Sequence, residues 1–312
     1  MTVGAATRRS RRTAPAPRAS SKVRRAHLEY PSISGLMHHA SRLLARLIPA
    51  ALLLFLLFPG RIAQAQGRSF DHGPFDALLR AHVTRGGMVD YDAFDASPEF
   101  PRYLARLAAF DPSTLARAEQ IAFWINAYNA YTIQLINKHD ERRSIRNINK
   151  TFGVKGYGPW REKLAKVGGK AYGLDDIEQG ILRKRYDEPR VHFALVCAAM
   201  GCPPLRTEAY TGARLDAQLD DQARVFLLRS PAKNRVDVGS RTVYLSPIFV
   251  EFRDYIKDFG GSHASVGRYI ARYFPAGPER DLLTSGDFKV KVTNYDWTLN
   301  SQAQARRAQG TT

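Results

Sequence analysis

Residues 114–139, TLARAEQIAFWINAYNAYTIQLINKH, decide the fold of this chain. Apolar side chains recur there at helical spacing and form one continuous stripe, made of Ile121, Trp124, Ile125, Tyr128, Thr132, Leu135 and Ile136. The opposite side is hardly polar either, with Phe123, Ala127 and Ile133. A helix that is apolar nearly all round belongs inside a domain. We therefore expect a buried central helix over about residues 114–139.

Two asparagines, Asn126 and Asn129, lie three residues apart on one face of this helix. A buried amide without partners costs about 1–3 kcal/mol, so both side chains need hydrogen bonds. We expect them to bond to neighbouring backbone and to fix the orientation of the helix. The alternative is functional, with Asn126 orienting a catalytic group or a ligand.

The rest of the chain alternates between helical patterns and short strand patterns. Helical spacing and capping residues predict helices over residues 74–84, 98–110, 174–185, 211–228, 248–259 and 263–274. Alternating runs predict short strands at 88–94, 144–148 and 288–293, and hairpins at 164–174 (turning at Gly168-Gly169) and at 235–245. Because helices dominate, the predicted fold class is α+β: a helix-rich single domain with a small antiparallel sheet.

The first 65 residues differ in composition from the rest. They carry 11 Lys and Arg but only one acid, and their apolar run at 47–58 has 12 residues. A membrane span needs about 20. Small residues in Ala63-Gln64-Ala65 fit a cleavage site, so we predict a signal peptide over 37–65, cut near Ala65, and a periplasmic or secreted protein. Residues 1–36 are either a disordered extension or precede a start at Met37. An uncleaved anchor is the alternative, and the only expected contact with a membrane.

The charge of the chain lies mostly in this leader. The whole chain carries +18, and the leader's surplus of 10 leaves +8, interspersed with acids, for residues 66–312. Nucleic-acid binding needs a concentrated basic face, so we do not expect it. No internal repeat or long linker interrupts the chain, which predicts one globular domain over residues 66–300 and a disordered tail over 301–312.

Both cysteines lie in the apolar run PRVHFALVCAAMGCPPL, residues 189–205. Three alternatives stay open for Cys197 and Cys202: a disulfide, a thiol nucleophile, or two buried inert thiols. Bridged Cα atoms lie within about 7 Å, which a strand or an unbroken helix over five residues exceeds. A disulfide therefore requires the chain to fold back at Ala199–Gly201.

His192 is the obvious base for a thiol, but its spacing from Cys197 is awkward. Five residues along a helix place the two side chains roughly 140° apart, and five along a strand place them on opposite faces. A site would have to be assembled from separate elements. A zinc site of His192, Cys197, Cys202 and Glu178 lacks any standard ligand spacing, and no cofactor-binding motif is present, so we predict neither metal nor cofactor.

Glu178 is the best-placed acid in the chain. It lies on the apolar stripe of the predicted helix 174–185, among Leu174, Ile177 and Ile181. Such a carboxylate is either paired with a cation in the core or kept for a function. We favour the ion pair.

Five strings, in this order, resemble the family of domains of unknown function 547, in its exported bacterial branch. They are FWINAYNAYTI (123–133), DDIEQGILR (175–183), RVHFALVCAAMGCPPL (190–205), LSPIFVEFRDYIKDFG (245–260) and YDWTLN (295–300). The likeness covers about residues 74–300. It implies that one site is shared by candidates from these motifs: Asn126, Glu178, His192, Cys197, Asp296 and Trp297. In plant members of the family, serine can replace the residue at the position of Cys202, which favours Cys197 as the special thiol.

Two functions follow from these residues. The first is a thiol-dependent hydrolase or acyl-transfer enzyme of the cell envelope, in which Cys197 is the nucleophile and His192 the base. Glu178 or Asp296 would polarise the histidine and Asn126 would donate to an oxyanion. The alternative is a non-catalytic domain with structural cysteines that binds a small molecule or an envelope partner. It would bind through the glycine-rich loop at 153–160 and the loop at 201–210. The candidate binding residues of the site are Cys202, Trp160, Tyr295 and Trp297.

Overall fold

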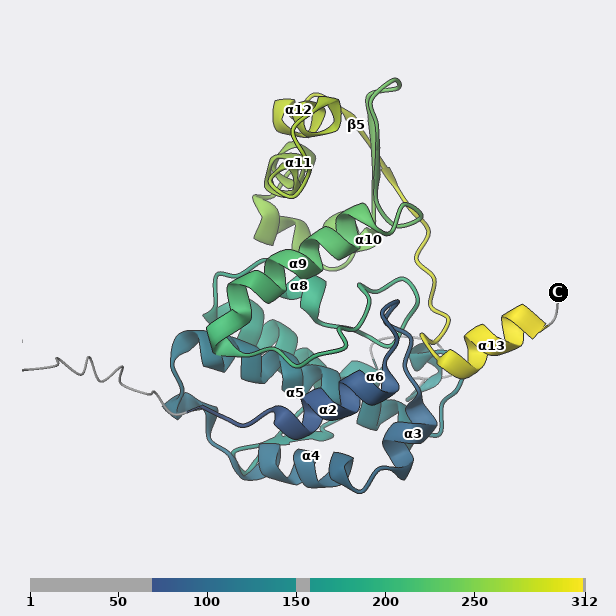
Figure 1. The fold of residues 1–312 in the computed structure, drawn as a ribbon. Helices are drawn as coiled ribbons and strands as arrows, with labels where there is room; N and C mark the ends of the chain where they lie inside the picture. Colours follow the sequence, from purple (N-terminus) through teal and green to yellow (C-terminus); the bar gives the residue numbers. More distant parts are fainter. Residues whose placement is uncertain (1–68, 150–157, 311–312) are drawn as a thin grey trace, which may run out of the picture. The chain divides into compact units, whose positions relative to one another are not determined.

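The central element of the fold is α5, Arg117–Lys138 (Figure 1). The computed structural model describes residues 69–149 and 158–310. Every α5 side chain from Ile121 to Ile133 is buried, as are Leu135 and Ile136. The predicted buried central helix is thereby confirmed, and the chain has the predicted α+β class.

One hydrophobic core surrounds α5. The elements that precede α5 are α2 (Gly73–His82), α3 (Tyr91–Ala96), α4 (Glu99–Ala109) and the 3₁₀ turn η2 (Pro112–Thr114). The elements that follow it are η3 (Ile145–Asn147), α6 (Gly158–Arg161), β1 (Ala165–Val167), β2 (Lys170–Tyr172), the π-helix η4 (Asp176–Leu182), α7 (Arg183–Arg185) and α8 (Val191–Ala194). The β1–β2 hairpin is confirmed, and Gly168 and Gly169 have the positive φ that its turn requires.

A second hydrophobic core includes Phe193, Phe226, Phe249 and Phe259. It is built by α9 (Leu215–Leu228, after the turn η5, Gly212–Arg214), β3 (Arg235–Asp237), β4 (Thr242–Leu245), α10 (Pro247–Val250), η6 (Tyr255–Phe259), α11 (His263–Ala271), α12 (Pro278–Ser285) and β5 (Lys289–Val292). Helix α9 joins the two cores, because Leu215 and Leu219 pack in the first and Phe226 and Leu227 in the second.

The sheets are small, as predicted, but one of them is mixed. β1 and β2 form an antiparallel pair, and β3 pairs with β4 antiparallel. β5 lies parallel to β4, with Val243 opposite Val290. The predicted antiparallel pairing therefore holds for β1–β2 and β3–β4, but not for β5. The α11–α12 segment carries the chain from β4 back to the start of β5, which is the kind of crossover that parallel pairing needs.

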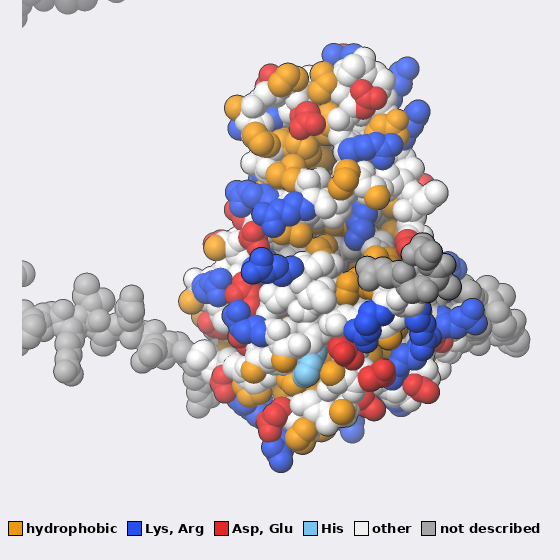
Figure 2. All heavy atoms as spheres, turned by 45° about the vertical axis from the view of Figure 1, so that its right-hand side comes forward, with side chains coloured by type: hydrophobic (Ala, Val, Ile, Leu, Met, Phe, Trp, Pro, Cys, Tyr) orange, Lys and Arg blue, Asp and Glu red, His pale blue; other side chains and the backbone are white. Residues whose placement is uncertain are grey.

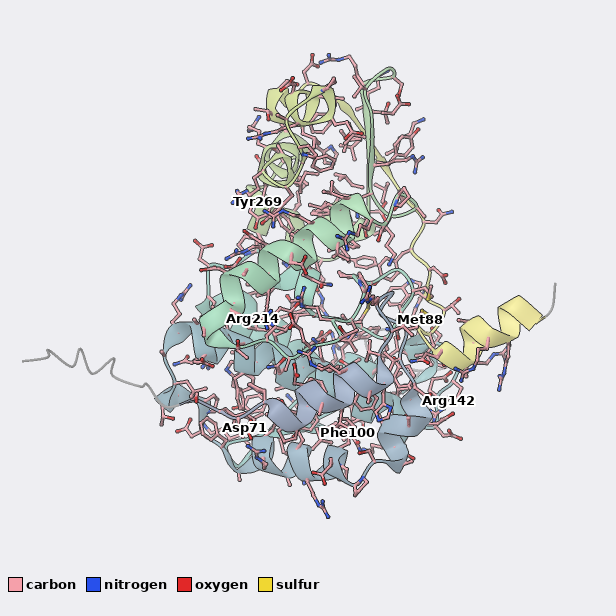
Figure 3. All side chains as sticks on the ribbon, viewed as in Figure 1. Asp71, Met88, Phe100, Arg142, Arg214 and Tyr269 are labelled. Atoms are coloured by element: carbon pink, nitrogen blue, oxygen red, sulfur yellow. A yellow bond between two sulfur atoms is a disulfide. The ribbon has the colours of Figure 1, made fainter. Side chains whose placement is uncertain are left out.

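Several predicted elements differ in the structure. Residues 88–94 form an isolated bridge at Val89 and then α3, and residues 144–148 form η3 in place of an edge strand. The predicted helix 248–259 is broken between α10 and η6. Within the predicted tail 301–312, Gln302–Gly310 form the helix α13. Gln304 of α13 donates to the carbonyl of Arg142, labelled in Figure 3 beside the start of that helix.

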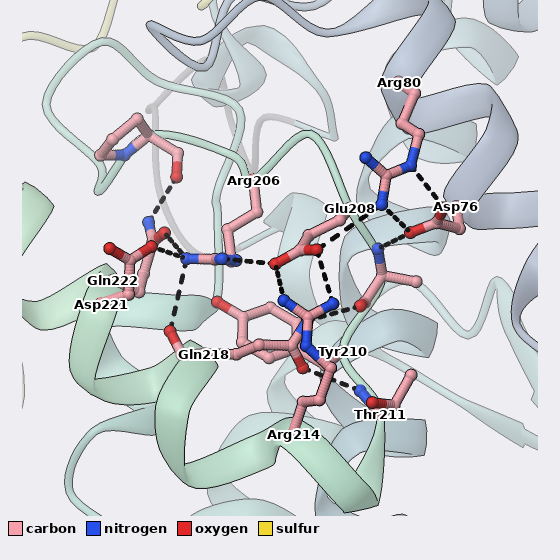
Figure 4. A network of polar contacts seen from close by, with 12 residues as sticks. Asp76, Arg80, Arg206, Glu208, Tyr210, Thr211, Arg214, Gln218, Asp221 and Gln222 are labelled. Atoms are coloured by element: carbon pink, nitrogen blue, oxygen red, sulfur yellow. Dashed lines mark hydrogen bonds and ion pairs between the residues drawn. The ribbon is translucent and has the colours of Figure 1, made fainter.

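A polar network holds the loop that precedes η5 (Figure 4). Glu208 accepts hydrogen bonds from Arg206 at 2.5 Å and from Arg214 at 3.0 Å, and Arg80 lies 3.6 Å from it. Burial alone would raise the pKa of Glu208, but its bonds to Arg206, Gln218 and Arg214 lower it to about 2. The loop is therefore fixed by charge as well as by packing.

Charges of both signs are interspersed on the face shown in Figure 2. Within residues 69–149 and 158–310, no helix is long and apolar enough to cross a membrane. The predicted leader (1–36 and 37–65, with its cut near Ala65) and most of the glycine-rich loop 152–159 lie outside the described residues.

Candidate functional site

A cavity of about 390 Å³ lies between the two cores. It combines aromatic walls, five charged side chains and both cysteines. Its lining comprises Tyr128, Arg146, Trp160, Asp175, Glu178, His192, Leu195, Cys197, Cys202, Pro203, Ile248, Glu251, Phe252, Arg253, Tyr255, Tyr295 and Trp297. A concave, largely apolar space with a few converging polar groups is the usual form of a small-molecule site.

Asn129 of α5 positions the segment that leads to Cys197. Its side-chain amide donates to the carbonyl of Ala194 at 3.0 Å, and its carbonyl accepts from the backbone N–H of Val196 at 3.0 Å. A buried extended segment is thereby held by one side chain. The prediction that Asn129 bonds to neighbouring backbone is confirmed.

Residues 295–301 hold the turn that follows Cys197. Ala199 and Leu299 form an antiparallel bridge, and the backbone N–H groups of Met200 and Gly201 donate to the carbonyls of Thr298 and Asp296, each at 2.8 Å. Residues 295–301 thus contact a turn about a hundred positions earlier in the chain.

Cys197 and Cys202 form a disulfide, with their Cα atoms 6.3 Å apart. The chain folds back between them, and Ala198 takes a positive φ of 59°. Of the three alternatives for the cysteine pair, the structure contains the disulfide, and the predicted reversal of the chain is present. Neither sulfur is a thiol in this state.

Tyr295 lies against this turn, and its hydroxyl is 3.1 Å from each sulfur. Its ring packs so close to Gly201 that a Cβ on that glycine would come within 2.8 Å of it. Burial, and then the charge of Glu178, raise the pKa of Tyr295, so the hydroxyl stays protonated. Tyr295 therefore keeps the one hydroxyl hydrogen, which the two sulfurs share as acceptors.

Glu178 enters the cavity from the π-helix η4 and is 7% exposed. Its carboxylate accepts from the hydroxyl of Tyr255 and from that of Tyr128, the latter at 3.4 Å. The ion pairs among the described residues include none with Glu178, so the predicted pair is not found there, although the charges of Glu178 and Arg253 interact. The alternative, a carboxylate kept for a function, stays open.

His192 lines the cavity but does not bond to a cysteine. Its Nε2 lies 2.6 Å from Oδ2 of Asp258, and its ring centre is 4.2 Å from that of Tyr255. Burial opposes ionisation of Asp258, but the bonds from His192 and Arg183 lower its pKa to about 2. His192 thus has a carboxylate partner that is 66 residues away in sequence.

Aromatic side chains form one wall of the cavity. The rings of Tyr295 and Trp297 lie 4.6 Å apart, Phe252 lies 4.7 Å from Tyr295, and Trp160 lies 6.0 Å from Trp297. The guanidinium of Arg146 lies 5.1 Å from the centre of the Trp297 ring. The predicted binding residues Trp160, Tyr295 and Trp297 are thus in one place.

Two predicted catalytic residues lie elsewhere. Asn126 does not line the cavity, because its amide exchanges two hydrogen bonds with the backbone of Tyr210, at 2.8 and 2.9 Å. Asp296 is exposed, and its carboxylate accepts from the backbone N–H of Thr298 at 2.8 Å. The structure therefore brings together Glu178, His192, Cys197, Cys202 and the three aromatic residues, but not these two.

Sequence reasoning missed Tyr128, Tyr255, Asp258 and Phe252. Tyr255 and Asp258 lie inside LSPIFVEFRDYIKDFG (245–260), one of the strings that resemble the family, so this string could have identified them as site candidates. Tyr128 lies on the apolar stripe of the central helix. In the described part of the chain, no cluster of three or more His, Cys, Asp or Glu side chains is placed to hold a metal ion.

A family model described as "Protein of unknown function, DUF547" matches residues 112–227. This segment holds α5, Glu178, His192 and both cysteines, whereas Tyr255, Asp258, Tyr295 and Trp297 follow it in sequence. No curated protein and no solved structure matches the chain. Over residues 112–227, the chain resembles the DUF547 family of proteins of unknown function.

Proposed function

We propose that the cavity binds a small neutral or cationic molecule that has a flat apolar face and a group that donates hydrogen bonds. The observation that carries this proposal is Glu178, a nearly buried carboxylate with hydroxyl partners at the wall of an aromatic cavity. A carboxylate accepts up to about four hydrogen bonds, so Glu178 retains acceptor capacity for a ligand.

The charges around the cavity favour such a ligand over an anion. Asp175 and Arg253 form an ion pair at 2.7 Å. The other charged side chains that line the cavity are two acids, Glu178 and Glu251, and one base, Arg146. The lining therefore has one more negative than positive charge. The rings of Phe252, Tyr295 and Trp297 offer faces on which a flat or cationic group stacks favourably.

Three fragments of one shape test the proposal: benzylamine, benzyl alcohol and benzoate. Binding is followed by tryptophan fluorescence, because Trp160 and Trp297 line the cavity. Dissociation constants of about 1 mM are the expected scale for fragments of this size. We expect benzylamine to bind about tenfold more tightly than benzoate, with benzyl alcohol between them.

A matched pair of variants assigns this preference to one carboxylate. Glu178→Gln should remove the advantage of benzylamine over benzyl alcohol, since it removes the charge and keeps the shape. Glu279→Gln changes an exposed acid of α12 and should leave the preference intact. Equal binding of the three fragments, or tightest binding of benzoate, would contradict the proposal.

A thiol-dependent hydrolase or acyl transferase is our second proposal, restricted to the reduced protein. It is supported by Cys197, which is partly exposed and lines the cavity. It is weakened by the disulfide and by the pairing of His192 with Asp258. Iodoacetamide labelling of the reduced protein against pH tests it. A catalytic thiol should react with an apparent pKa well below about 8.5.

We also propose that the protein acts outside the cytoplasm, in the periplasm or as a secreted protein. The basic, apolar leader and Ala63-Gln64-Ala65 support this proposal. N-terminal sequencing of the protein recovered from the periplasm or the medium should begin near Gln66. A mature protein that retains residues 37–65 would contradict it.

A further inference from the structure

The two sulfurs of the disulfide have different surroundings. Both cysteines line the cavity, but Cys202 is only 2% exposed whereas Cys197 is partly exposed. The Cys202 sulfur accepts from the backbone N–H of Cys197 at 3.0 Å and lies 3.1 Å from the Tyr295 hydroxyl. Among the described residues, the Cys197 sulfur has only that hydroxyl as a partner, at 3.1 Å. A disulfide sulfur carries no hydrogen, so Tyr295 is the donor.

We propose that the Cys197–Cys202 disulfide is a thiol–disulfide exchange site, in which an external thiolate attacks Cys197 and Cys202 is the leaving group. The co-reactant is a small dithiol or the reduced dithiol of a reductase. This activity does not rest on the binding proposal, since it needs only an opening that reaches the Cys197 sulfur.

The exchange is a two-electron transfer in two steps. The thiolate of the dithiol bonds to the Cys197 sulfur, the Cys197–Cys202 bond breaks, and Cys202 leaves as a thiolate that takes a proton from solvent. The second thiol of the dithiol then loses its proton and attacks the dithiol sulfur that is bonded to Cys197 in the mixed disulfide. Cys197 leaves and is protonated. The dithiol is oxidised to a disulfide, and the protein disulfide is reduced to two thiols.

The direction of attack follows from access and from the leaving group. A thiolate reaches the partly exposed Cys197 more readily than Cys202, which is 2% exposed although it also lines the cavity. A leaving thiolate that accepts hydrogen bonds departs faster, and Cys202 accepts from the backbone N–H of Cys197 besides sharing the Tyr295 hydroxyl with the other sulfur. Tyr295 keeps its proton at the alkaline pH that thiolate attack requires, because burial and Glu178 raise its pKa.

The turn is also held independently of the disulfide. The backbone bonds from Met200 and Gly201 to residues 296–298, and those between Asn129 and residues 194–196, do not involve sulfur. The two thiols should therefore stay close after reduction, and the disulfide should form again without refolding of the chain.

Two single-cysteine variants of the full-length chain test the assignment of the two sulfurs. Cys202→Ser leaves Cys197, and Cys197→Ser leaves Cys202. Each is treated in the folded state with 5,5′-dithiobis(2-nitrobenzoate), and the released thiolate is followed by absorbance. We expect Cys197 to react at least about tenfold faster than Cys202. In guanidinium chloride the two rates should become equal, which shows that the difference comes from the fold.

The role of Tyr295 is tested in the chain with both cysteines. Tyr295→Phe should slow reduction by dithiothreitol about tenfold, measured by alkylation and mass spectrometry. Tyr186→Phe, which removes a hydroxyl bonded to Gln120 outside the cavity, should not change the rate. If Tyr295→Phe does not fold, the reaction rates of Cys197 and Cys202 in the two single-cysteine variants decide the test of the proposal by themselves. Equal or faster reaction of Cys202, or reduction only at the rate of global unfolding, would overturn the proposal.

Discussion

Two partly enclosed carboxylates, Glu178 and Glu208, are stabilised in opposite ways. Glu208 is surrounded by the guanidinium groups of Arg206, Arg214 and Arg80 in a network that closes a loop (Figure 4). Glu178 accepts from two tyrosine hydroxyls beside a cavity. A carboxylate whose charge is fully compensated has a structural task. One that is solvated by hydroxyls next to an open space is available to a ligand.

The two asparagines of α5 connect this helix to the two regions separately. Asn126 bonds to the backbone of Tyr210, two residues after Glu208, and Asn129 bonds to the segment that leads to Cys197. The largest expected effect is therefore a matched pair. Asn126→Ala and Asn129→Ala should each lower the free energy of unfolding by about 3 kcal/mol, because each leaves two buried backbone groups without partners. Urea unfolding measures both.

The two variants Asn126→Ala and Asn129→Ala should differ in their effect on the disulfide. Only Asn129→Ala should alter the rate at which dithiothreitol reduces the disulfide, since only Asn129 positions the segment before Cys197. If both variants change that rate equally, the two regions are not independent and the comparison fails.

Removing the charge of Glu208 comes next in size. Glu208→Gln leaves Arg206 with a weaker partner inside the network and should lower the free energy of unfolding by about 2 kcal/mol. Urea unfolding at neutral pH provides the measurement. An unchanged midpoint would show that the network contributes nothing beyond packing.

The same carboxylate predicts a pH window. The folded pKa of Glu208 is about 2, below the usual 4.5, so its contribution is complete above about pH 4.5 and is lost as the pH falls towards 2. Glu208→Gln should therefore flatten the loss of stability in that window. Asp258, with a folded pKa of about 2 against 3.8, loses its contribution in a narrower window and serves as the comparison.

A methyl group at Gly201 tests the packing of the cavity wall. Gly201→Ala places its Cβ about 2.8 Å from the ring of Tyr295, so the ring must move. We expect a loss of about 1–2 kcal/mol in unfolding free energy and a changed fluorescence response to benzylamine. Gly180→Ala, where the added Cβ meets nothing within 4 Å, is the control and should not change that response.

The smallest expected effect on stability belongs to Glu178. Glu178→Gln keeps an oxygen acceptor for the tyrosine hydroxyls and leaves no cation unpaired, so unfolding free energy should change by less than about 1 kcal/mol. A loss as large as that of Glu208→Gln would show that Glu178 is structural, and the contrast between the two regions would disappear.

Sequence patterns predicted those helices and hairpins whose defining residues lie close together in the sequence. The central helix, the β1–β2 hairpin with its two glycines and the β3–β4 hairpin are of this kind. The parallel pairing of β4 with β5 and the bond between His192 and Asp258 are not, because they join residues that are far apart in sequence. The π-helical form of residues 176–182 was not predicted either, because their sequence is equally compatible with an ordinary α-helix.

The candidate site was predicted in part for the same reason. Spacing excluded a simple pairing of His192 with Cys197 along one element, and the structure gives His192 another partner. Spacing does not name that partner. Nor does it distinguish Asn129, which supports the cavity, from Asn126, which supports the Glu208 loop, because both lie on one face of one helix.

The contacts of residues 295–301 impose an order of assembly on the molecule. These residues hold the disulfide turn, supply Tyr295 and Trp297, and reach Val89 and Tyr91 near the start of the domain. The chain is made from the other end, so the cavity stays incomplete until its last wall has been synthesised. Contacts of such long range slow folding. Until then the two cysteines lack the hydroxyl of Tyr295, which in the folded chain lies 3.1 Å from each sulfur.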